Sequence, residues 1–287
     1  MKPTTFTSDS RLFGIFQTGE YLSVKFSAYF HAYEAEFAKY VGKPVTFVEV
    51  GVLHGGSLFM WREYLGPQAR IIGVDLSPGA KRWDQHGFEI YIGDQGDPSF
   101  WKGFFEKVGP VDVLLDDGGH TNTHQIVTVD SVIAHINDGG VILIEDVNTS
   151  YLSRFGNPSR FSFINYAKRA IDAINSRGPE LEAIDNAFRR RVSSTTFYES
   201  MAAFHIDDRN AALSQIVTNS GKETGAQDMR ALSAMSGVES YARRRLAFLR
   251  NVPVAMRVAE IAFPILRSLK QRWLSLKERR SLAKYFR

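Results

Sequence analysis

Short apolar runs alternate with amphipathic stretches along residues 45–147. The apolar runs have the length of strands: VTFVEV (45–50), RIIGVDL (70–76), FEIYIG (88–93), VDVLLDD (111–117) and GVILIEDV (140–147). Helical periodicity separates them at 57–66, 98–108 and 123–137. Strands that alternate with helices are typical of βαβ units, and nearly continuous apolar strands indicate that helices cover both faces. The pattern predicts an α/β fold with a doubly wound, mostly parallel sheet.

Further elements flank this region. Residues 20–41 and 161–177 have the apolar spacing of amphipathic helices, and 195–207 predicts two short strands joined as a C-terminal β-hairpin. From 241 onward the chain has the pattern of a basic helical tail. We therefore expect an N-terminal helical segment (1–44), a domain over 45–209 and a helical basic C-terminal tail (210–287).

The composition excludes several kinds of site. The chain of 287 residues contains no cysteine, which excludes a disulfide scaffold, a zinc–thiolate site, an iron–sulfur cluster and a thiol nucleophile. The first residues contain no long apolar stretch, so we expect no secretory signal. No apolar run approaches the roughly 18 residues that a membrane-spanning helix needs. We expect a cytoplasmic protein.

Charge is distributed unevenly along the chain. Residues 241–287 carry 13 Lys and Arg against two acids, so this segment has a net charge of +11 and the remainder a net charge of −7. The basic segment is interpreted as a solvated face, as a face packed on the acidic domain, or as a surface that binds an anionic membrane peripherally. Nucleic acid is the least favoured partner, because no nucleic-acid-binding fold is recognised.

A glycine loop follows the first predicted strand. It reads Gly51-Val-Leu-His-Gly55-Gly56-Ser57, which lacks the spacing of the dinucleotide fingerprint. Glycines at a strand-to-helix turn let a ligand approach the backbone closely. Glu49 stands before the loop and Asp75 ends the next strand, where a carboxylate can accept hydrogen bonds from ribose hydroxyls. These acids disfavour a pyrophosphate and favour a ligand with a positive centre.

These motifs resemble those of the class I S-adenosylmethionine-dependent methyltransferases. The resemblance implies that the glycine loop lines the methionine and ribose part of the cofactor, that Asp75 holds the ribose, and that Asp94 and Gln95 lie by the adenine. The cofactor-binding residues expected on this basis are Glu49, Gly51, Gly55, Gly56, Ser57, Asp75, Ser77, Asp94, Gln95 and Asp116.

Acidic residues gather at the ends of two further predicted strands. Asp116 and Asp117 end one strand, and Glu145 and Asp146 end another. Because the carboxyl ends of parallel strands share one rim, these acids should converge, and a hard cation such as Mg²⁺ would relieve their repulsion. His120 is expected where the next helix begins, an environment that favours the neutral ring and makes it a candidate general base.

The order Asp-Asp-Gly-Gly-His, followed by Glu-Asp with Thr149 and Tyr151, is similar to the Mg²⁺-dependent sugar O-methyltransferases of macrolide biosynthesis, of the mycinamicin and macrocin type. The resemblance implies that Asp117, Glu145 and Asp146 hold the metal and that His120 is the base. His124, four residues later, could share a helix face with His120 and bind metal, although a packing role is favoured.

The function expected from these features is S-adenosylmethionine-dependent, metal-assisted O-methylation of a sugar or glycoside hydroxyl, on a natural product or a glycolipid. Three alternatives remain open: a methyltransferase for a non-sugar vicinal diol, a metal-dependent hydrolase, and a non-catalytic scaffold whose tail binds membranes. The helix expected over 20–41 could cover the site or form a homo-oligomer contact.

Overall fold

The computed structural model describes residues 9–156, 159–177, 187–211, 217–222 and 224–225, together with 268, 272–273, 276–277, 279–280 and 282–286. The chain divides into two compact units, residues 1–216 and 217–287. In the second unit the structure describes one 3-10 helix, η7 (Ala283–Phe286). Among the described residues, no helix has both the length and the apolar character needed to cross a membrane. Most of the predicted basic tail lies outside the described residues.

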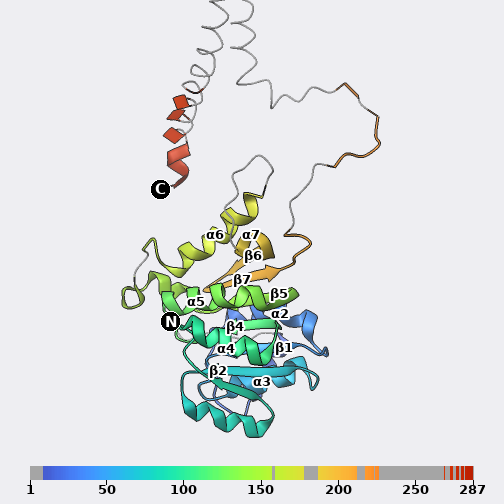
Figure 1. The fold of residues 1–287 in the computed structure, drawn as a ribbon, viewed down its shortest axis with the longest axis vertical. Helices are drawn as coiled ribbons and strands as arrows, with labels where there is room; N and C mark the ends of the chain where they lie inside the picture. The colour runs from blue at the N-terminus through green and yellow to red at the C-terminus, as the bar shows by residue number, and fades with distance from the viewer. Residues whose placement is uncertain are drawn as a thin grey trace, which may run out of the picture. The chain divides into compact units, whose positions relative to one another are not determined.

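The first unit is built on a seven-stranded sheet in the order β3-β2-β1-β4-β5-β7-β6 (Figure 1). Its strands are β1 (Thr46–Val50), β2 (Arg70–Asp75), β3 (Glu89–Ile92), β4 (Val111–Asp116), β5 (Ile136–Ile144), β6 (Val192–Tyr198) and β7 (Met201–Ile206). Strands β1 to β5 pair in parallel, whereas β7 runs antiparallel to both β5 and β6. The predicted doubly wound, mostly parallel sheet and its C-terminal hairpin are confirmed.

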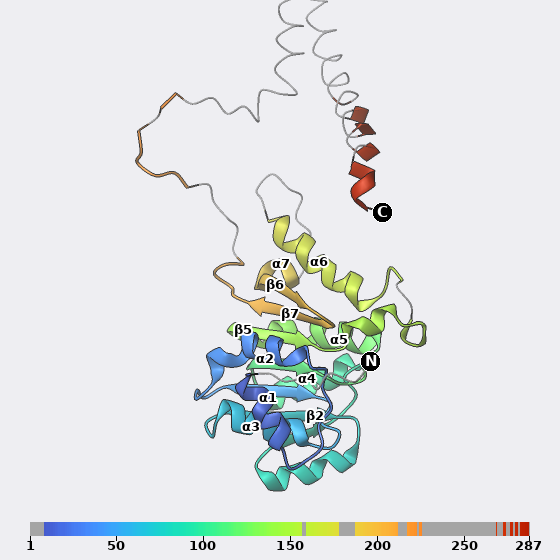
Figure 2. The same cartoon turned by 180° about the vertical axis from the view of Figure 1, so that it is seen from behind.

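Helices cover both faces of this sheet. One layer contains α1 (Arg11–Thr18), α2 (Tyr29–Phe37) and α3 (Gly56–Leu65), which Figure 2 shows on its near side. The opposite layer contains α4 (Pro98–Val108), α5 (Asn122–Val132), α6 (Phe163–Asn175) and α7 (Ala187–Arg191). Alternate residues of a strand point to opposite faces, so Leu115 packs in the first core and Leu114 in the second. Both faces of the sheet are therefore shielded from solvent, which explains why nearly every position of the strands is apolar.

Short 3-10 helices connect several of these elements: η1 (Ala38–Tyr40), η2 (Pro78–His86), η3 (Ile133–His135), η4 (Val147–Tyr151) and η5 (Ser153–Phe155). The prediction of one helix over 123–137 was wrong at its end. The helix stops at Val132, and β5 already begins at Ile136, because Ile136 pairs with Val111 of β4. As a result β5 is longer than predicted at its start, while Glu145 and Asp146 lie just beyond its end.

The N-terminal region corrects a second prediction. The helix expected over 20–41 begins only at Tyr29, and residues 20–28 contain no helix. The alternation of apolar Leu22, Val24 and Phe26 with polar neighbours explains this, because a period of two is typical of extended chain. The helix α1 was not predicted, although the Ser10 hydroxyl caps it by accepting a hydrogen bond from the Phe13 backbone N–H.

The helix α2 is part of the main core. Its Tyr33 and Phe37 rings pack edge-on against the Trp61 ring of α3, with ring centroids 5.1 and 5.5 Å apart. Phe37 also contacts Phe47 of β1 at 5.4 Å between centroids. This packing fixes the N-terminal segment against the strand that precedes the glycine loop.

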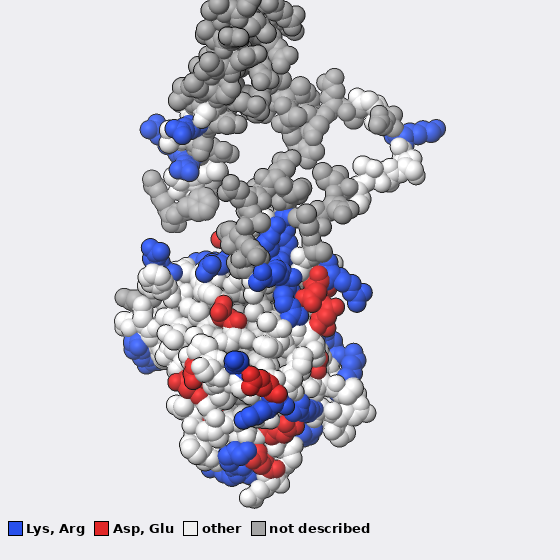
Figure 3. All heavy atoms as spheres, in the orientation of Figure 1, with Lys and Arg blue, Asp and Glu red and all other residues white. Residues whose placement is uncertain are grey.

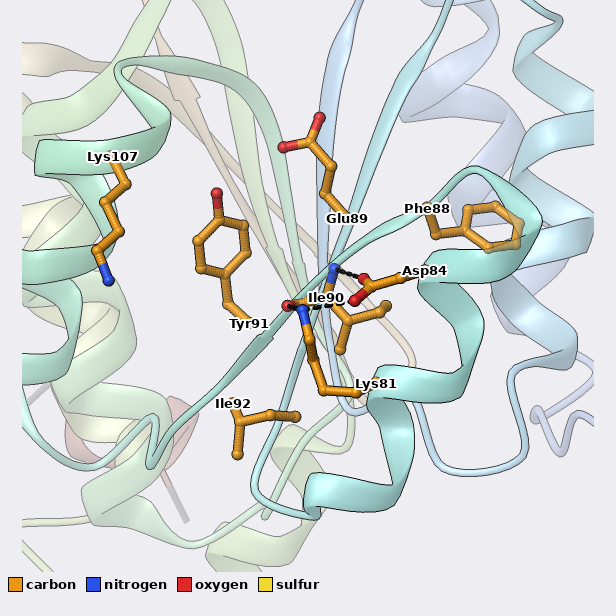
Figure 4. Close-up of a pocket in the computed structure, with 8 residues that line it drawn as sticks. All are labelled: Lys81, Asp84, Phe88, Glu89, Ile90, Tyr91, Ile92 and Lys107. Atoms are coloured by element: carbon orange, nitrogen blue, oxygen red, sulfur yellow. Dashed lines mark hydrogen bonds and ion pairs between the residues drawn. The ribbon is translucent and has the colours of Figure 1, made fainter.

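A pocket lies along β3, an edge strand of the sheet (Figure 4). Within it, the Ile90 backbone N–H donates to the Asp84 carboxylate at 2.8 Å, and the Lys81 ammonium donates to the Ile90 carbonyl at 2.8 Å. These two side chains satisfy the backbone groups of the edge strand, which protects the edge from pairing with another chain. The pocket contains none of the predicted site residues.

Charged side chains are interspersed over the described surface that faces the viewer in Figure 3, with Lys and Arg gathered over the end that carries α6 and α7. The helix α7 itself contains three successive arginines, Arg189 to Arg191. Arg191 is bound internally, because its guanidinium donates to the carbonyls of Ile133, Ala134 and Ile136. Part of this basic cluster therefore serves to hold α7 on the domain.

Candidate active site

The predicted site residues lie at the carboxyl ends of the parallel strands. Glu49 is in β1 next to its last residue, Asp75 ends β2 and Asp116 ends β4. The pair Glu145 and Asp146 follows β5 directly. Since β2, β1, β4 and β5 are neighbours in the sheet, the fold brings these acids to one rim, as the sequence predicted.

Glycine is required in the loop after β1 by both conformation and space. Gly51 has a φ of +89°, and a Cβ atom built on it would lie 2.1 Å from the Asp117 carbonyl oxygen. Gly55 has a φ of +81° and packs against the Trp83 ring, while a Cβ on Gly56 would lie 2.3 Å from the Tyr21 carbonyl oxygen. The loop is thus in close contact with the end of β4 and with the N-terminal segment.

Asp75 holds this loop in place. Its Oδ2 accepts hydrogen bonds from the backbone N–H groups of Val52 and Leu53, at 2.9 and 3.0 Å. Its Oδ1 accepts from the Ser77 N–H at 2.7 Å. The carboxylate remains partly exposed at the mouth of the loop, so it can still meet a ligand while it fixes the backbone around it. Ser77 itself is exposed beside it.

Glu49 and Ser57 bind each other inside the protein. Glu49 is fully buried; it accepts hydrogen bonds from the Ser57 hydroxyl at 2.8 Å and from the Trp61 indole N–H at 3.1 Å. Burial raises the pKa of Glu49 to about 7. These contacts tie β1 to α3, so in this structure both side chains support the loop from within.

Asp94 and Gln95, the two residues expected by the adenine, differ in exposure, because Asp94 is exposed and Gln95 is buried. The buried Gln95 amide donates to the Asp116 carboxylate at 2.9 Å, and its Oε1 accepts from the Gly119 N–H at 2.8 Å. Burial also raises the pKa of Asp116. Asp94 is exposed, and its Oδ1 lies 3.7 Å from His124 Nε2. Asp94 is therefore open to a ligand, whereas Gln95 and Asp116 fix the loop that carries His120.

Asp117, His120 and Asp146 form a group that could hold a metal ion. One ligand atom from each residue lies within 4.8 Å of the others. His120 Nε2 is 3.4 Å from an Asp146 carboxylate oxygen and 3.9 Å from one of Asp117. The three side chains are partly exposed, with 19 to 26% of each accessible to solvent. Two carboxylates and an imidazole at a solvent-accessible rim fit a divalent cation.

The backbone at this group is strained. His120 and Asp146 have φ values of +53° and +54°, a conformation that is uncommon for residues other than glycine. The Thr149 hydroxyl lies 2.8 Å from the carbonyl oxygens of both residues and stabilises the two turns. Strain of this kind is often found where a site needs a side chain in one orientation.

The sequence did not predict Lys25, which lies at the centre of the acids. Its side chain is 1% exposed, and its Nζ lies 2.5 Å from Asp117 Oδ2, 3.0 Å from Glu145 Oε1 and 4.0 Å from Glu49 Oε1. Burial alone would lower the pKa of Lys25, but the carboxylates of Glu145, Asp117 and Glu49 raise it above its ordinary value. The lysine is therefore charged.

Two tyrosines of α2 complete this arrangement and were also missed. The Tyr33 hydroxyl donates to the Glu145 carboxylate. The Tyr29 hydroxyl donates to Asp146 Oδ1 at 2.6 Å and accepts from the Asp146 N–H at 3.1 Å. Glu145, 1% exposed, consequently lies outside the Asp117–His120–Asp146 group, and its role as a metal ligand stays a prediction.

His124 does not join the group either. It lies in the first turn of α5, where Gly119 packs against its ring: a Cβ on Gly119 would be 2.1 Å from His124 Nδ1. The nearest carboxylate to its Nε2 that the structure describes is that of Asp94. This placement agrees with the packing role that the sequence favoured.

Comparison with known proteins identifies the class. Residues 48–147 match a family model described as a methyltransferase domain. The MycE methyltransferase of the mycinamycin biosynthetic pathway, solved in complex with Mg and SAH, superposes with a TM-score of 0.63 at 25% identity, over 79% of this chain and 59% of that one. The fold and the matched domain are those of an S-adenosylmethionine-dependent methyltransferase.

Within that class the chain is similar to sugar O-methyltransferases. It is 30% identical over 158 residues to 8-demethyl-8-alpha-L-rhamnosyl tetracenomycin-C 2'-O-methyltransferase of Streptomyces olivaceus, covering 51% of this chain and 41% of that protein. It is 32% identical over 154 residues to mycinamicin VI 2''-O-methyltransferase of Micromonospora griseorubida, covering 50% and 38%. The matches thus span less than half of these relatives' length. The family resemblance predicted from the sequence is confirmed.

Proposed function

We propose that this protein transfers a methyl group from S-adenosylmethionine to a hydroxyl of a sugar or glycoside, with Mg²⁺ bound at the rim. The observation that carries the proposal is the contact between the two halves of the site. The glycine loop contacts the acidic group directly, because Gly51 packs on the backbone carbonyl of Asp117. A methyl donor in the loop and an acceptor at the acids would therefore be neighbours.

The donor half consists of the glycine loop with Asp75 and the exposed Asp94. The close approach of Gly51, Gly55 and Gly56 to other parts of the chain leaves the backbone itself as the surface that a cofactor would meet. In this proposal Asp75 binds the ribose while it fixes the loop, and Asp94 lies by the adenine. The loop is supported from inside the protein by four further residues: Glu49, Ser57, Gln95 and Asp116. Ser77 lies next to Asp75 and donates its backbone N–H to the Asp75 carboxylate.

The acceptor half consists of Asp117, His120, Glu145 and Asp146. Asp117, Glu145 and Asp146 would hold Mg²⁺, which would lower the pKa of an acceptor hydroxyl. His120 Nε2 faces the Asp117 and Asp146 carboxylates and takes the hydroxyl proton. The hydroxyl oxygen then forms a bond to the methyl carbon while the bond from that carbon to sulfur breaks, which leaves S-adenosylhomocysteine. Positioning of the two reactants supplies much of the acceleration.

The relatives support a sugar acceptor. One relative is named as a 2'-O-methyltransferase of a rhamnosyl tetracenomycin-C, another as a 2''-O-methyltransferase of mycinamicin VI, and MycE has been solved with Mg, SAH and mycinamycin VI. The methyltransferase match favours this function over the hydrolase alternative. A non-sugar vicinal diol and a glycolipid acceptor remain candidates. The homo-oligomer stays a prediction. The membrane-binding tail also stays a prediction, because most of residues 241–287 lie outside the described part of the chain.

Calorimetric titration of S-adenosylhomocysteine into EDTA-treated protein tests the donor half. We expect micromolar affinity in the wild type and its loss in Asp75→Ala. No binding by folded wild-type protein would contradict the methyltransferase proposal. Turnover assays with simple glycosides, a catechol and a glycolipid, each with Mg²⁺ and with EDTA, then identify the acceptor class. Turnover that survives EDTA would remove the metal from the proposal.

A further inference from the structure

The ring of His124 lies between two loops at the rim of the sheet. A Cβ atom on Gly119, in the loop after β4, would lie 2.1 Å from His124 Nδ1. A Cβ atom on Gly96, in the loop after β3, would lie 2.9 Å from His124 Cδ2. The backbone N–H of His124 donates to the Thr121 hydroxyl at 3.2 Å, which caps α5. The two loops and the start of the helix therefore leave the imidazole ring little freedom to move.

The two nitrogens of this ring have different surroundings. Nδ1 is buried and has no hydrogen-bond partner among the described residues. Nε2 lies 3.7 Å from Asp94 Oδ1, and 31% of the His124 side chain and 55% of the Asp94 side chain are accessible to solvent. This distance is too long for a hydrogen bond, but the negative carboxylate favours a proton on the nitrogen that faces it. The pair therefore presents an N–H donor next to a carboxylate acceptor at the surface.

This pair lies where the proposed function places the adenine of the cofactor. Asp94 Oδ1 accepts a hydrogen bond from the Gly96 N–H at 2.7 Å, which orients the carboxylate. Gln95 joins the loop after β3 to the loop after β4, because its amide donates to Asp116 and accepts from the Gly119 N–H. Adenine carries its N6 amino donor beside a ring-nitrogen acceptor, and a paired acceptor and donor on a protein recognise this arrangement.

We propose that His124 and Asp94 together recognise the adenine base of the cofactor. The Asp94 carboxylate accepts a hydrogen bond from the N6 amino group, and the His124 Nε2–H donates to a ring nitrogen beside that group. The inference rests on the proposed function, because it presumes S-adenosylmethionine at this rim. It gives His124 a binding role in addition to packing, and it explains why the two glycines leave room for a planar side chain whose polar edge reaches the surface.

Calorimetric titration of cofactor analogues into EDTA-treated protein tests the inference. S-adenosylhomocysteine is compared with its 1-deaza and 7-deaza forms, each of which replaces one ring nitrogen beside the amino group by C–H. In the wild type, the form that lacks the contacted nitrogen should bind roughly tenfold more weakly than S-adenosylhomocysteine. In His124→Phe, which keeps a planar ring without an N–H, S-adenosylhomocysteine itself should lose about tenfold in affinity, and the preference over that deaza form should disappear.

The controls separate recognition from packing. His124→Gln retains a side-chain N–H and should restore part of the preference. His135→Phe makes the same replacement beyond the other end of α5, where the ring stacks on Phe105 with centroids 4.2 Å apart, and should leave all affinities unchanged. Thermal unfolding establishes that each variant is folded. If His124→Phe does not fold, His124→Leu, which also lacks an N–H, takes its place.

Two outcomes would overturn the inference alone. One is equal affinity of the wild type for S-adenosylhomocysteine and both deaza forms, a result that needs no variant. The other is a loss of affinity in His124→Phe that is the same for all three ligands, which would leave His124 with packing only. A folded wild-type protein that binds none of the three ligands would instead contradict the proposed function.

Discussion

The two ends of the site treat their carboxylates differently. At the β1–β2 end, Glu49 and Asp75 accept hydrogen bonds chiefly from neutral groups: a hydroxyl, an indole N–H and backbone N–H groups. At the β4–β5 end, Asp117, Glu145 and Asp146 face one another across a lysine and a histidine. The carboxylates at the β1–β2 end fix the backbone of the glycine loop, whereas those at the β4–β5 end bring several negative charges close together.

This difference indicates what each end requires. Carboxylates bound by fixed neutral donors are satisfied within the protein, so the donor end is preorganised before any ligand arrives. Carboxylates that crowd together repel one another unless a cation is present. In the proposed function the acceptor end would therefore depend on Lys25 and on an added divalent cation, and the donor end on its backbone geometry. Variants at the two ends should accordingly fail in different assays.

The largest effect is expected from His120→Ala. Without the base, methyl transfer should fall by roughly 10²–10⁴-fold, while S-adenosylhomocysteine affinity stays near that of the wild type. Steady-state turnover and calorimetry measure the two quantities. His31→Ala, an exposed histidine of α2, is the matched control and should retain turnover. Turnover that survives His120→Ala would remove this residue from the chemistry, and a loss of Mn²⁺ affinity would make it a ligand.

Gly51→Ala should break the contact that joins the two ends. An alanine would have to adopt a φ of +89°, and its Cβ would lie 2.1 Å from the Asp117 carbonyl oxygen. We therefore expect a loss of roughly 2–4 kcal/mol in the free energy of unfolding. Urea unfolding measures it. The control is Gly87→Ala, which has a φ of +82° but no atom within 4 Å of its added Cβ. Equal losses in the two variants would mean that only the backbone conformation matters at Gly51.

The same contrast explains how much the sequence could predict. Apolar runs mark the strands, and the acids that follow them come to one rim because parallel strands share their direction. The glycine loop and the acids near it could therefore be assigned from local patterns. The same patterns could not show whether a given acid faces a ligand or a neighbour, and the structure turns Glu49, Gln95 and Asp116 inward.

Lys25 could not be assigned in this way. Its partners Asp117 and Glu145 are 92 and 120 residues away in the chain, and no local spacing encodes such a contact. The alternation from Leu22 to Phe26 indicates extended chain and places Lys25 on the side opposite the apolar residues. Such a pattern predicts that the apolar residues face inward and the lysine outward, whereas the structure exposes Leu22, Val24 and Phe26 and buries Lys25.

Asp75→Asn should affect the donor end alone. The amide cannot accept hydrogen bonds at both positions, so at least one of the N–H groups of Val52, Leu53 or Ser77 loses its partner. We expect S-adenosylhomocysteine affinity to fall by about tenfold, in line with the loss of a hydrogen bond to a charged carboxylate, while Mn²⁺ affinity stays unchanged. Calorimetry and paramagnetic resonance measure the two. Parallel losses of both affinities would show that the ends are not independent.

The smallest effect is expected at Glu49, in the pH dependence of stability. Because burial raises the pKa of Glu49 from 4.5 to about 7, the folded protein retains a proton that the unfolded chain releases between these pH values. The contribution of Glu49 to the free energy of unfolding therefore falls as the pH rises from 4.5 to about 7 and is constant above that range. Glu49→Gln removes this contribution, so the variant should gain stability relative to the wild type as the pH rises from 5 to about 7, and the difference should then stay constant.

Urea unfolding of both proteins at several pH values measures this difference. The buried Asp116, whose pKa is also raised, is present in both proteins, so its titration cancels from the comparison. Identical pH profiles would mean that Glu49 is already ionised at pH 5, with Lys25 compensating its charge at 4.0 Å despite the burial. That result would group Glu49 of β1 with the charged acids at the ends of β4 and β5 rather than with Asp75 of β2.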